Sequence, residues 1–222
     1  MAIEPATRAR AGRPRQDERA TDVREGLLDA ATRLATERGF DATSIREIAE
    51  AAGVTPGMIA YYFGGKQGLY EAMIDRVYQR VLTQIRAFAE EPGTAGSDPL
   101  ARLVDFQVAT FASEPWLPPL VVREVLARDG PFRTFFAERI ASGPAQIIPE
   151  LLQREMTSGR VRDDLDPTLT MLSLMGMVLF PFIAHPLLHE VLGYEINPDF
   201  RDRLAAHTNA ILARGLAPGG VS

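Results

Sequence analysis

The stretch ATSIREIAEAAGVTPGMIAYYFGGKQGLYEAM, residues 42–73, contains signals for two short helices separated by a glycine turn. Ser44 and Glu47 have the S-x-x-E spacing of a capping box, in which the side chain of each residue accepts a hydrogen bond from the backbone N–H of the other. A helix that begins here meets Gly53 after barely two turns, and glycine is the residue that most often ends a helix. The first half of the stretch therefore predicts one short helix followed by a tight turn.

The second half of the stretch predicts another short helix and the start of a long one. Thr55 followed by Pro56 is a helix start signal, with the threonine as N-cap and the proline at the first helical position. This helix stops at Gly64-Gly65, and Lys66 then begins a helix that we expect to reach about residue 90. Lys66 is the only lysine in the 222-residue chain, where every other basic residue is arginine.

Upstream, residues 22–39 show one apolar stripe at helical spacing and a glycine at the end. Helices shorter than about 12 residues are marginal in water, so the two short ones must pack on this longer helix. Three helices whose last two are short and joined by a glycine turn form a helix-turn-helix unit. The residues expected to hold it together are Leu27, Leu34, Phe40, Ile45, Ile48, Val54, Ile59 and Phe63.

The same motifs resemble the DNA-binding domain of TetR-family transcriptional regulators over about residues 22–75. The resemblance is carried by a Ser/Thr-capped second helix, an A-G-V turn, a short third helix ending in aromatics, and the lysine that follows. It implies an all-α protein with a three-helix DNA-binding domain (residues 21–65) and a larger helical ligand-binding and dimerisation domain (residues 66–215). A flexible basic arm (1–20) and a disordered tail (216–222) flank them.

Each motif then has an expected role on a duplex DNA operator. The start of the third helix enters the major groove, and the phenolic hydroxyls at its end donate to phosphate oxygens. Lys66 becomes a compact cation for a phosphate. The family more often has tyrosine where this chain has Ala60, so one phosphate contact depends on the neighbouring tyrosines instead. The expected DNA-binding residues are Ser44, Arg46, Thr55, Pro56, Gly57, Met58, Tyr61, Tyr62 and Lys66.

The charge distribution and composition set further limits. Residues 1–66 carry ten basic and ten acidic residues, so the rest of the chain carries the whole net charge of −5. The first 15 residues hold four arginines against one glutamate, and this arm either lies in a DNA minor groove or is a solvated disordered segment. The chain has no cysteine, which excludes disulfides and thiolate metal sites. With no secretory signal pattern, we expect a cytoplasmic protein.

Beyond residue 90, the sequence predicts only helices, and no segment alternates as a strand does. The apolar run within 167–189 is long enough to suggest a membrane span, but its prolines, His185 and acidic flank favour a buried helix. No interaction with a membrane is therefore expected. The expected helices are residues 98–113, 118–128, 131–157 (kinked or broken at Pro144 and Pro149), 167–189 and 198–215.

Two functional surfaces are expected in this second domain. Aromatic and methionine side chains suit an adaptable pocket for an unknown small-molecule effector, although a plain core explains most of them equally well. The pocket candidates are Phe106, Phe111, Trp116, Met156, Met171 and Met175. The two last long helices are expected to pair with those of a second copy in a homodimer. The candidates for that contact are Met171, Leu174, Leu179, Leu204, Ile211 and Leu212.

No catalytic, cofactor or metal site is predicted. His185 and His189 have an i, i+4 spacing that can bind a metal, but the only third ligand nearby in sequence is Glu190, and Pro186 disturbs the turn. No phosphate-binding glycine loop, nucleophile elbow or catalytic carboxylate pair is present. Two alternatives stay open: a helical small-molecule-binding protein or enzyme with an incidental helix-turn-helix, and a nonspecific architectural DNA binder, which the acidic body disfavours.

Overall fold

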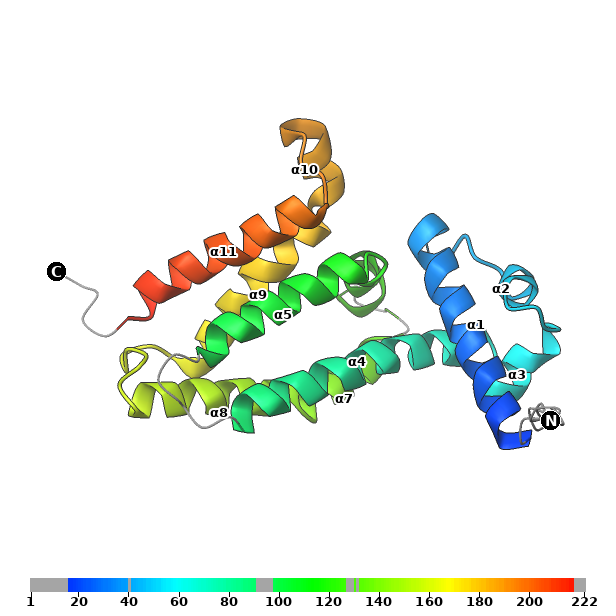
Figure 1. The fold of residues 1–222 in the computed structure, drawn as a ribbon, viewed down its shortest axis with the longest axis horizontal. Helices are drawn as coiled ribbons and strands as arrows, with labels where there is room; N and C mark the ends of the chain where they lie inside the picture. The colour runs from blue at the N-terminus through cyan, green and yellow to red at the C-terminus, as the bar shows by residue number, and fades with distance from the viewer. Residues whose placement is uncertain (1–15, 40, 91–97, 127–129, 131, 218–222) are drawn as a thin grey trace, which may run out of the picture.

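The computed structural model describes residues 16–39, 41–90, 98–126, 130 and 132–217, and all regular elements within them are helices. This agrees with the all-α prediction. The elements are α1 (Gln16–Arg38), α2 (Ile45–Ala51), α3 (Gly57–Phe63), α4 (Lys66–Glu90), α5 (Pro99–Ser113), α6 (Leu117–Leu120), the π-helix η1 (Val121–Leu126), α7 (Arg133–Ala141), α8 (Pro144–Thr157), α9 (Pro167–Ile183), α10 (His185–Leu192) and α11 (Pro198–Gly215). Figure 1 shows α1–α3 as a separate lobe at one end, joined to the body through α4.

Helices α1 to α3 form the expected three-helix unit. Ser44 and Glu47 make the complete capping box at the start of α2, and Gly53 and Gly64 adopt positive φ angles of 69° and 74° after α2 and α3. The predicted packing residues form one core: Leu27, Leu34, Ile48 and Ile59 are buried, Ile45, Val54 and Phe63 pack partly buried against them, and Phe40 lies outside the described residues.

The same core continues beyond the helix-turn-helix. It includes Tyr70, Met73 and Val77 of α4, and also Trp116, Leu117, Leu120 and Phe132 from the body. A single apolar cluster therefore spans the boundary predicted at residue 65. Since burial of apolar side chains is the main favourable term in folding, the lobe is held against the body and is not merely tethered to it.

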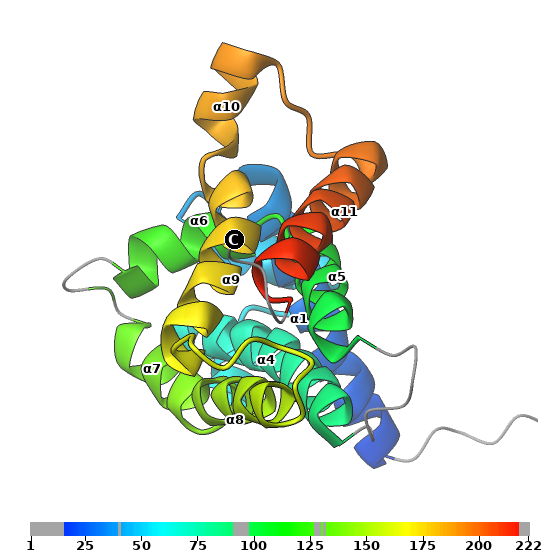
Figure 2. The same cartoon turned by 90° about the vertical axis from the view of Figure 1, so that its left-hand side faces the viewer.

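The body is a layered helical bundle with two further cores. The first lies where α4 and α5 pack on α8, around Leu103, Ile148 and Leu152, and the second lies where α5 packs on α9 and α11, around Val104, Val108 and Val178. Figure 2, which looks at the end of the bundle, shows α5 between α4 and α11. Adjacent residues Leu103 and Val104 face different cores, which places α5 at the centre of the body.

Several predicted helix boundaries are wrong. Helix α1 begins at Gln16 and not near residue 22, so it includes the end of the predicted arm. The segment expected to be one helix over 118–128 is a four-residue α-helix followed by a π-helix turn. The segment 131–157 is broken before Pro144 but continues through Pro149. Arg8, Arg10, Arg13 and Arg15 of the predicted arm lie outside the described residues.

The predicted helix 167–189 is also two helices. Helix α9 ends at Ile183 and α10 begins at His185, with the two axes bent by 64°. Pro186 in the first turn of α10 has no N–H to donate, and its ring would clash with a carbonyl one turn earlier in a continuous helix. Among the described residues, no one helix is long and apolar enough to cross a membrane, whereas this bent pair meets that test only when its two halves are joined.

Candidate DNA-binding interface

The start of α2 presents Ser44 and Arg46 to solvent, as expected for DNA contacts. The Ser44 hydroxyl accepts a hydrogen bond from the backbone N–H of Glu47 at 3.2 Å, and the Glu47 carboxylate accepts one from the N–H of Ser44 at 2.8 Å. These bonds with Ser44 lower the pKa of Glu47, with smaller contributions from the charges of Arg38 and Lys66. Ser44 therefore already serves as a cap, and only its remaining lone pair and hydroxyl proton are available to DNA.

The first turn of α3 is also exposed. Thr55, Pro56 and Gly57 lie on the surface, whereas Met58 is half-buried and packs against the core. The predicted Thr55 cap is wrong in detail, since α3 begins at Gly57 and the residue before it, Pro56, makes no side-chain capping bond. Thr55 instead accepts a bond from the N–H of Met58 through its backbone carbonyl, which leaves its hydroxyl outside the capping role.

The two tyrosines at the end of α3 differ in their surroundings. Tyr61 is 78% exposed, whereas Tyr62 is half-buried and packs on the core of the lobe. Their rings meet edge to face with centroids 4.9 Å apart. Tyr61 is thus exposed on the outer face of α3, with its ring in contact with that of Tyr62.

Lys66 interacts with other residues of the protein and is not simply an exposed cation available to a phosphate. Its ammonium lies 5.7 Å from the centre of the Tyr70 ring, the residue is half-buried, and its charge helps lower the pKa of Glu47 on α2. The single lysine therefore lies at the junction of α2 and α4. A phosphate contact at this position would add to an existing internal role.

A feature that sequence reasoning missed is the close approach of α3 and α4 at Gly68. A Cβ atom at this position would lie 1.9 Å from the carbonyl oxygen of Phe63. Only glycine allows the end of α3 to sit against the first turn of α4 in this way. The G-L pair after the lysine was the available signal, because glycine inside a helix usually has a packing reason.

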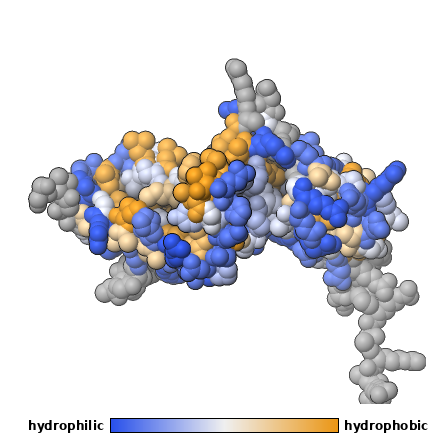
Figure 3. All heavy atoms as spheres, turned by 90° about the horizontal axis from the view of Figure 1, so that it is seen from above, coloured by the Kyte–Doolittle hydropathy of each residue, from blue (hydrophilic) through white to orange (hydrophobic). Residues whose placement is uncertain are grey.

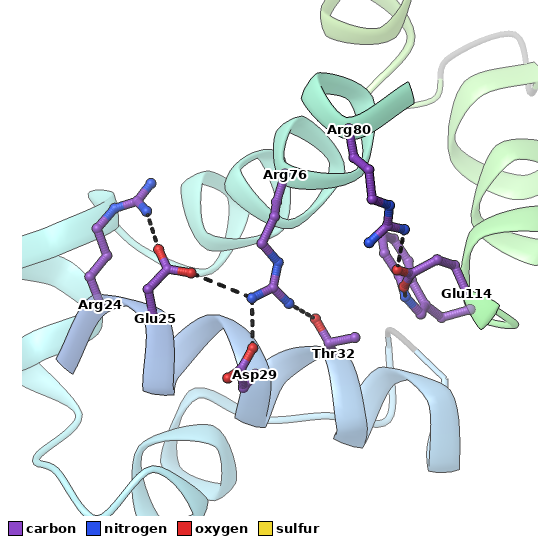
Figure 4. Close-up of polar contacts among 8 residues, drawn as sticks. Arg24, Glu25, Asp29, Thr32, Arg76, Arg80 and Glu114 are labelled. Carbon is purple, nitrogen blue, oxygen red and sulfur yellow. Dashed lines mark hydrogen bonds and ion pairs between the residues drawn. The ribbon is translucent and has the colours of Figure 1, made fainter. Parts of the chain in front are cut away.

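Charged side chains connect the lobe to the rest of α4 (Figure 4). Arg76 on α4 donates to Asp29 at 2.6 Å and to the hydroxyl of Thr32 at 3.0 Å, both on α1, and lies 3.6 Å from Glu25. One turn further along α4, Arg80 donates to Glu114 at 2.7 Å.

The body makes one more polar contact with the lobe and one that supports its contact with α4. Arg123 of η1 forms an ion pair with Asp41 of the α1–α2 loop at 3.2 Å. Trp116 donates its indole N–H to the same Glu114 carboxylate that Arg80 contacts, at 2.7 Å. The aromatic residue expected to line an effector pocket is thus part of the contact between body and α4.

The predicted pocket residues are not brought around one cavity. Trp116 belongs to the core shared with the lobe, Phe106, Met156 and Met171 belong to the second core, Phe111 lies between the first and third, and Met175 is half-buried on α9. A pocket of about 390 Å³ does occur among the described residues, but it lies where α5, α8 and α11 meet. None of the six predicted residues lines it; its polar lining includes Asp98, Glu155, Arg160 and Asn209.

The predicted dimer residues also divide into two groups. Leu174 and Leu212 are buried in the third core of the protomer, which removes them from the candidate contact surface. Met171, Leu179 and Leu204 are half-buried and Ile211 is 46% exposed. More exposed apolar residues on α9, not chosen from sequence, are Leu169, Leu172 and Phe180, at 63%, 56% and 62%. Figure 3, seen from above, shows hydrophobic side chains gathered over the body, while the lobe is mostly hydrophilic.

Comparisons with known proteins agree with this architecture. Residues 27–73, which run from α1 into α4, match the family model described as bacterial regulatory proteins, tetR family. The HTH-type transcriptional repressor Rv1474c of Mycobacterium tuberculosis is 29% identical over 164 residues, which cover 72% of this chain and 80% of that protein.

Two solved structures are similar over most of their length. The transcriptional regulator FadR from Bacillus subtilis, in complex with stearoyl-CoA, aligns with a TM-score of 0.67 and 20% identity, covering 89% of this chain and 99% of that one. AibR, in complex with isovaleryl coenzyme A and operator DNA, aligns with a TM-score of 0.65 and 18% identity, covering 86% and 98%. With the helix-turn-helix built as described and the family model matching that same segment, residues 27–73 form a DNA-binding segment of the tetR family of bacterial regulatory proteins.

Proposed function

We propose that this protein is a ligand-responsive transcriptional repressor that binds a palindromic DNA operator as a homodimer and is released by a small apolar or amphipathic effector. The observation that carries the proposal is the path of α4. This helix begins beside the exposed face of α2 and α3, shares a core with the lobe, and runs on into the body. A change of packing in the body is therefore transmitted to the recognition helix through one continuous element.

On DNA, the exposed group formed by Arg46, Thr55, Gly57 and Tyr61 would face the duplex, with α3 in the major groove. Ser44, Pro56, Met58, Tyr62 and Lys66 would support these contacts from the edge of the interface. No side chain caps the start of α3, and the partial positive charge of a helix N-terminus favours a nearby phosphate.

For the dimer, we propose that the exposed apolar residues of α9 and α11 face those of a second copy. Leu169, Leu172, Phe180 and Ile211 are more than two-fifths exposed on the protomer, and exposed large apolar side chains on neighbouring helices favour a protein-protein contact. A two-fold axis there would place two recognition helices on one side of the pair, as a palindromic operator requires.

The proposed effector class is supported by two similar structures that contain CoA thioesters, in which an apolar acyl group, long in one and short in the other, is joined to a charged CoA group. The contacts of Trp116 and Glu114 with α4 offer a place where a ligand in the body could change the position of that helix. The division into a DNA-binding part up to residue 65 and an effector and dimer part to residue 215 belongs to this proposal, as do a cytoplasmic location and the absence of catalysis.

The test begins with DNA selected from a random pool by the purified protein. We expect an inverted repeat whose half-sites are separated by about one helical turn, roughly 10 bp, or a multiple of it. A selected site without two-fold symmetry, or a monomer by sedimentation at micromolar concentration, would contradict the dimeric repressor. Equal affinity for selected and random duplexes would instead support a nonspecific DNA binder.

Effector control is tested by reciprocity. A ligand that weakens operator binding by a given factor must itself bind more weakly, by the same factor, when operator is present, and such factors are typically about 5- to 150-fold. Long- and short-chain acyl-CoA thioesters are suitable first probes. Equal ligand affinity with and without operator would show that the ligand site does not control DNA binding.

A further inference from the structure

Three side chains of types that can bind a metal ion lie close together on α10 and in the segment that follows it. His185 lies at the start of the helix, His189 one turn later, and Glu195 in the segment after the helix. One ligand atom from each of the three lies within 4.8 Å of the others. The two imidazole ring centres are 5.7 Å apart, and the Nδ1 atom of His189 is 3.3 Å from the Glu195 carboxylate.

The fold produces this group through the turn that ends α10. Gly193 caps the helix in the left-handed region, at φ 68°, and the chain then reverses towards His189. The Nδ1 of His189 lies 3.1 Å from the carbonyl oxygen of Tyr194, and a bond between them helps hold the returning segment beside the helix. A metal ion bound at Nε2 keeps this bond, whereas one bound at Nδ1 replaces it. The third group is therefore Glu195. The sequence alone indicates only the neighbouring Glu190 as a third ligand and predicts no metal site.

A ring nitrogen of His185 is left unpaired among the described residues. Its Nε2 atom is shielded from solvent and has no hydrogen-bond partner among the residues that the structure describes. Buried polar atoms are nearly always paired, and an exception calls for an explanation such as a bound ion. The ring is only half-buried as a whole, so a small rotation can bring this nitrogen to a ligand.

The geometry is close to that of a zinc site. Zinc binds imidazole nitrogen and carboxylate oxygen at about 2.0–2.2 Å, so tetrahedral donors lie about 3.3–3.5 Å apart. Three groups within 4.8 Å of one another reach this spacing by side-chain rotation, since His189 and Glu195 are exposed. Two histidines and one glutamate supply three ligands, and water completes the fourth position.

We propose that His185, His189 and Glu195 bind one divalent transition-metal ion of the Zn²⁺ class, which joins α10 to the segment that follows it. Figures 1 and 2 show α10 extending away from the bundle beyond the end of α9, and none of its residues is buried. A metal ion bound at both ends of this turn restricts its motion. The site is independent of the repressor function proposed above and does not require DNA or an effector.

The experiment titrates Zn²⁺ into untagged protein that has been freed of metal, in competition with a chromophoric chelator. The chain has three histidines and no cysteine, so few competing sites exist. We expect about one Zn²⁺ per chain. His185→Ala, His189→Ala and Glu195→Gln should each weaken binding by at least the roughly 10- to 100-fold seen for loss of an outer-shell partner. Hydrogen exchange of amides in residues 189–195 should slow when zinc is added.

Two matched controls separate this site from adventitious binding. Glu190→Gln removes the neighbouring exposed carboxylate, and His207→Ala removes the remaining histidine, on α11; both should bind zinc as the wild type does. Thermal melts without zinc check that the variants are folded. The proposal is overturned if the wild type binds no zinc at micromolar concentration, if the His185 and His189 variants bind normally, or if Glu190→Gln weakens binding as much as Glu195→Gln.

Discussion

The guanidinium group of Arg76, on α4, lies 2.6 Å from the carboxylate of Asp29, on α1, and joins the helix-turn-helix lobe to the helix that enters the body. Thr32 and Glu25 complete the contact on the α1 side. This ion pair is exposed on its Asp29 side, so its direct contribution to stability is small. Its position matters more, because it sets how α1 lies against α4.

The first prediction concerns this pair. A double-mutant cycle of Arg76→Ala and Asp29→Ala should give a coupling free energy of about 0.2–1 kcal/mol by urea denaturation, as exposed pairs do. The control cycle uses Arg33 and Glu37, which are 3.6 Å apart on the outer surface of α1 and join no two helices. We expect Arg76→Ala to reduce operator affinity and the control variants to leave it unchanged. If Arg76→Ala and the control variants change operator affinity equally, the Arg76–Asp29 pair does not couple the lobe to the body.

The second prediction concerns the contact between α3 and α4. Gly68→Ala places a methyl group against the Phe63 carbonyl, so the two helices must separate, at a cost of about 1–3 kcal/mol in the free energy of unfolding. Gly26→Ala is the matched control, since a Cβ at this position of α1 meets no atom within 4 Å. It should leave stability unchanged or raise it by about 0.5–1 kcal/mol. Chemical denaturation of both variants decides; equal stabilities would show that α3 is not held in the described position.

The third prediction is the pH dependence of stability through Tyr70. Burial raises the pKa of this phenol to about 12, partly offset by a hydrogen bond with Thr43. Because the folded pKa exceeds the value of 10 in the unfolded chain, the phenol contributes stability below pH 10 that is lost as the pH rises towards 12. The loss should amount to about 1–3 kcal/mol. Urea midpoints measured across this range should fall more steeply for the wild type than for Tyr70→Phe, and parallel curves would contradict the assignment.

The fourth prediction separates the two tyrosines of α3. Tyr61→Ala should leave the free energy of unfolding within about 0.5 kcal/mol, since the ring is 78% exposed, and should weaken operator binding. Tyr62→Ala should lower stability by about 1–3 kcal/mol, because it removes an aromatic ring packed on the core. If Tyr61→Ala binds operator as the wild type does, the outer face of α3 does not contact DNA at its end.

The fifth prediction concerns the single lysine. If Lys66 contacts a phosphate, Lys66→Gln should weaken binding to operator and random duplex alike and lower the slope of log affinity against log salt by about one unit. Arg46→Gln provides the comparison, from the exposed start of α2. If the salt slope changes for Arg46→Gln but not for Lys66→Gln, Lys66 does not contact DNA. Its role would then be the internal contact with Tyr70 and the interaction with the charge of Glu47.

Local signals made the helix-turn-helix predictable. The Ser44–Glu47 capping box and the glycines after α2 and α3 act through backbone groups only a few residues away, so their effects follow from spacing in the sequence. The apolar stripes of α1 and α4 likewise fixed which sides of these helices are buried. These local rules identified the three-helix unit, apart from the one-residue error in the start of α3, but not that Met58, Tyr62 and Lys66 are half-buried.

The body could not be predicted in the same way, because its important relationships join residues far apart in the chain. Helical spacing marked Leu174 and Leu212 as apolar but could not tell a protomer core from a dimer contact. Composition marked Trp116 and the methionines as pocket-forming, yet the packing of the helices places Trp116 in the first core and Met156 and Met171 in the second.

The sequence by itself determined the all-α fold, the lobe and its recognition helix, since caps, turns and periodicity are properties of neighbouring residues. Only the tertiary structure decided that Arg76 reaches Asp29, that Gly68 must be small, and that Glu195 joins His185 and His189. The physical reason is the same in each case. A side chain acts over a few ångströms, and which groups come within that distance depends on the angles between packed helices and on turns such as that at Gly193, which local preferences do not set.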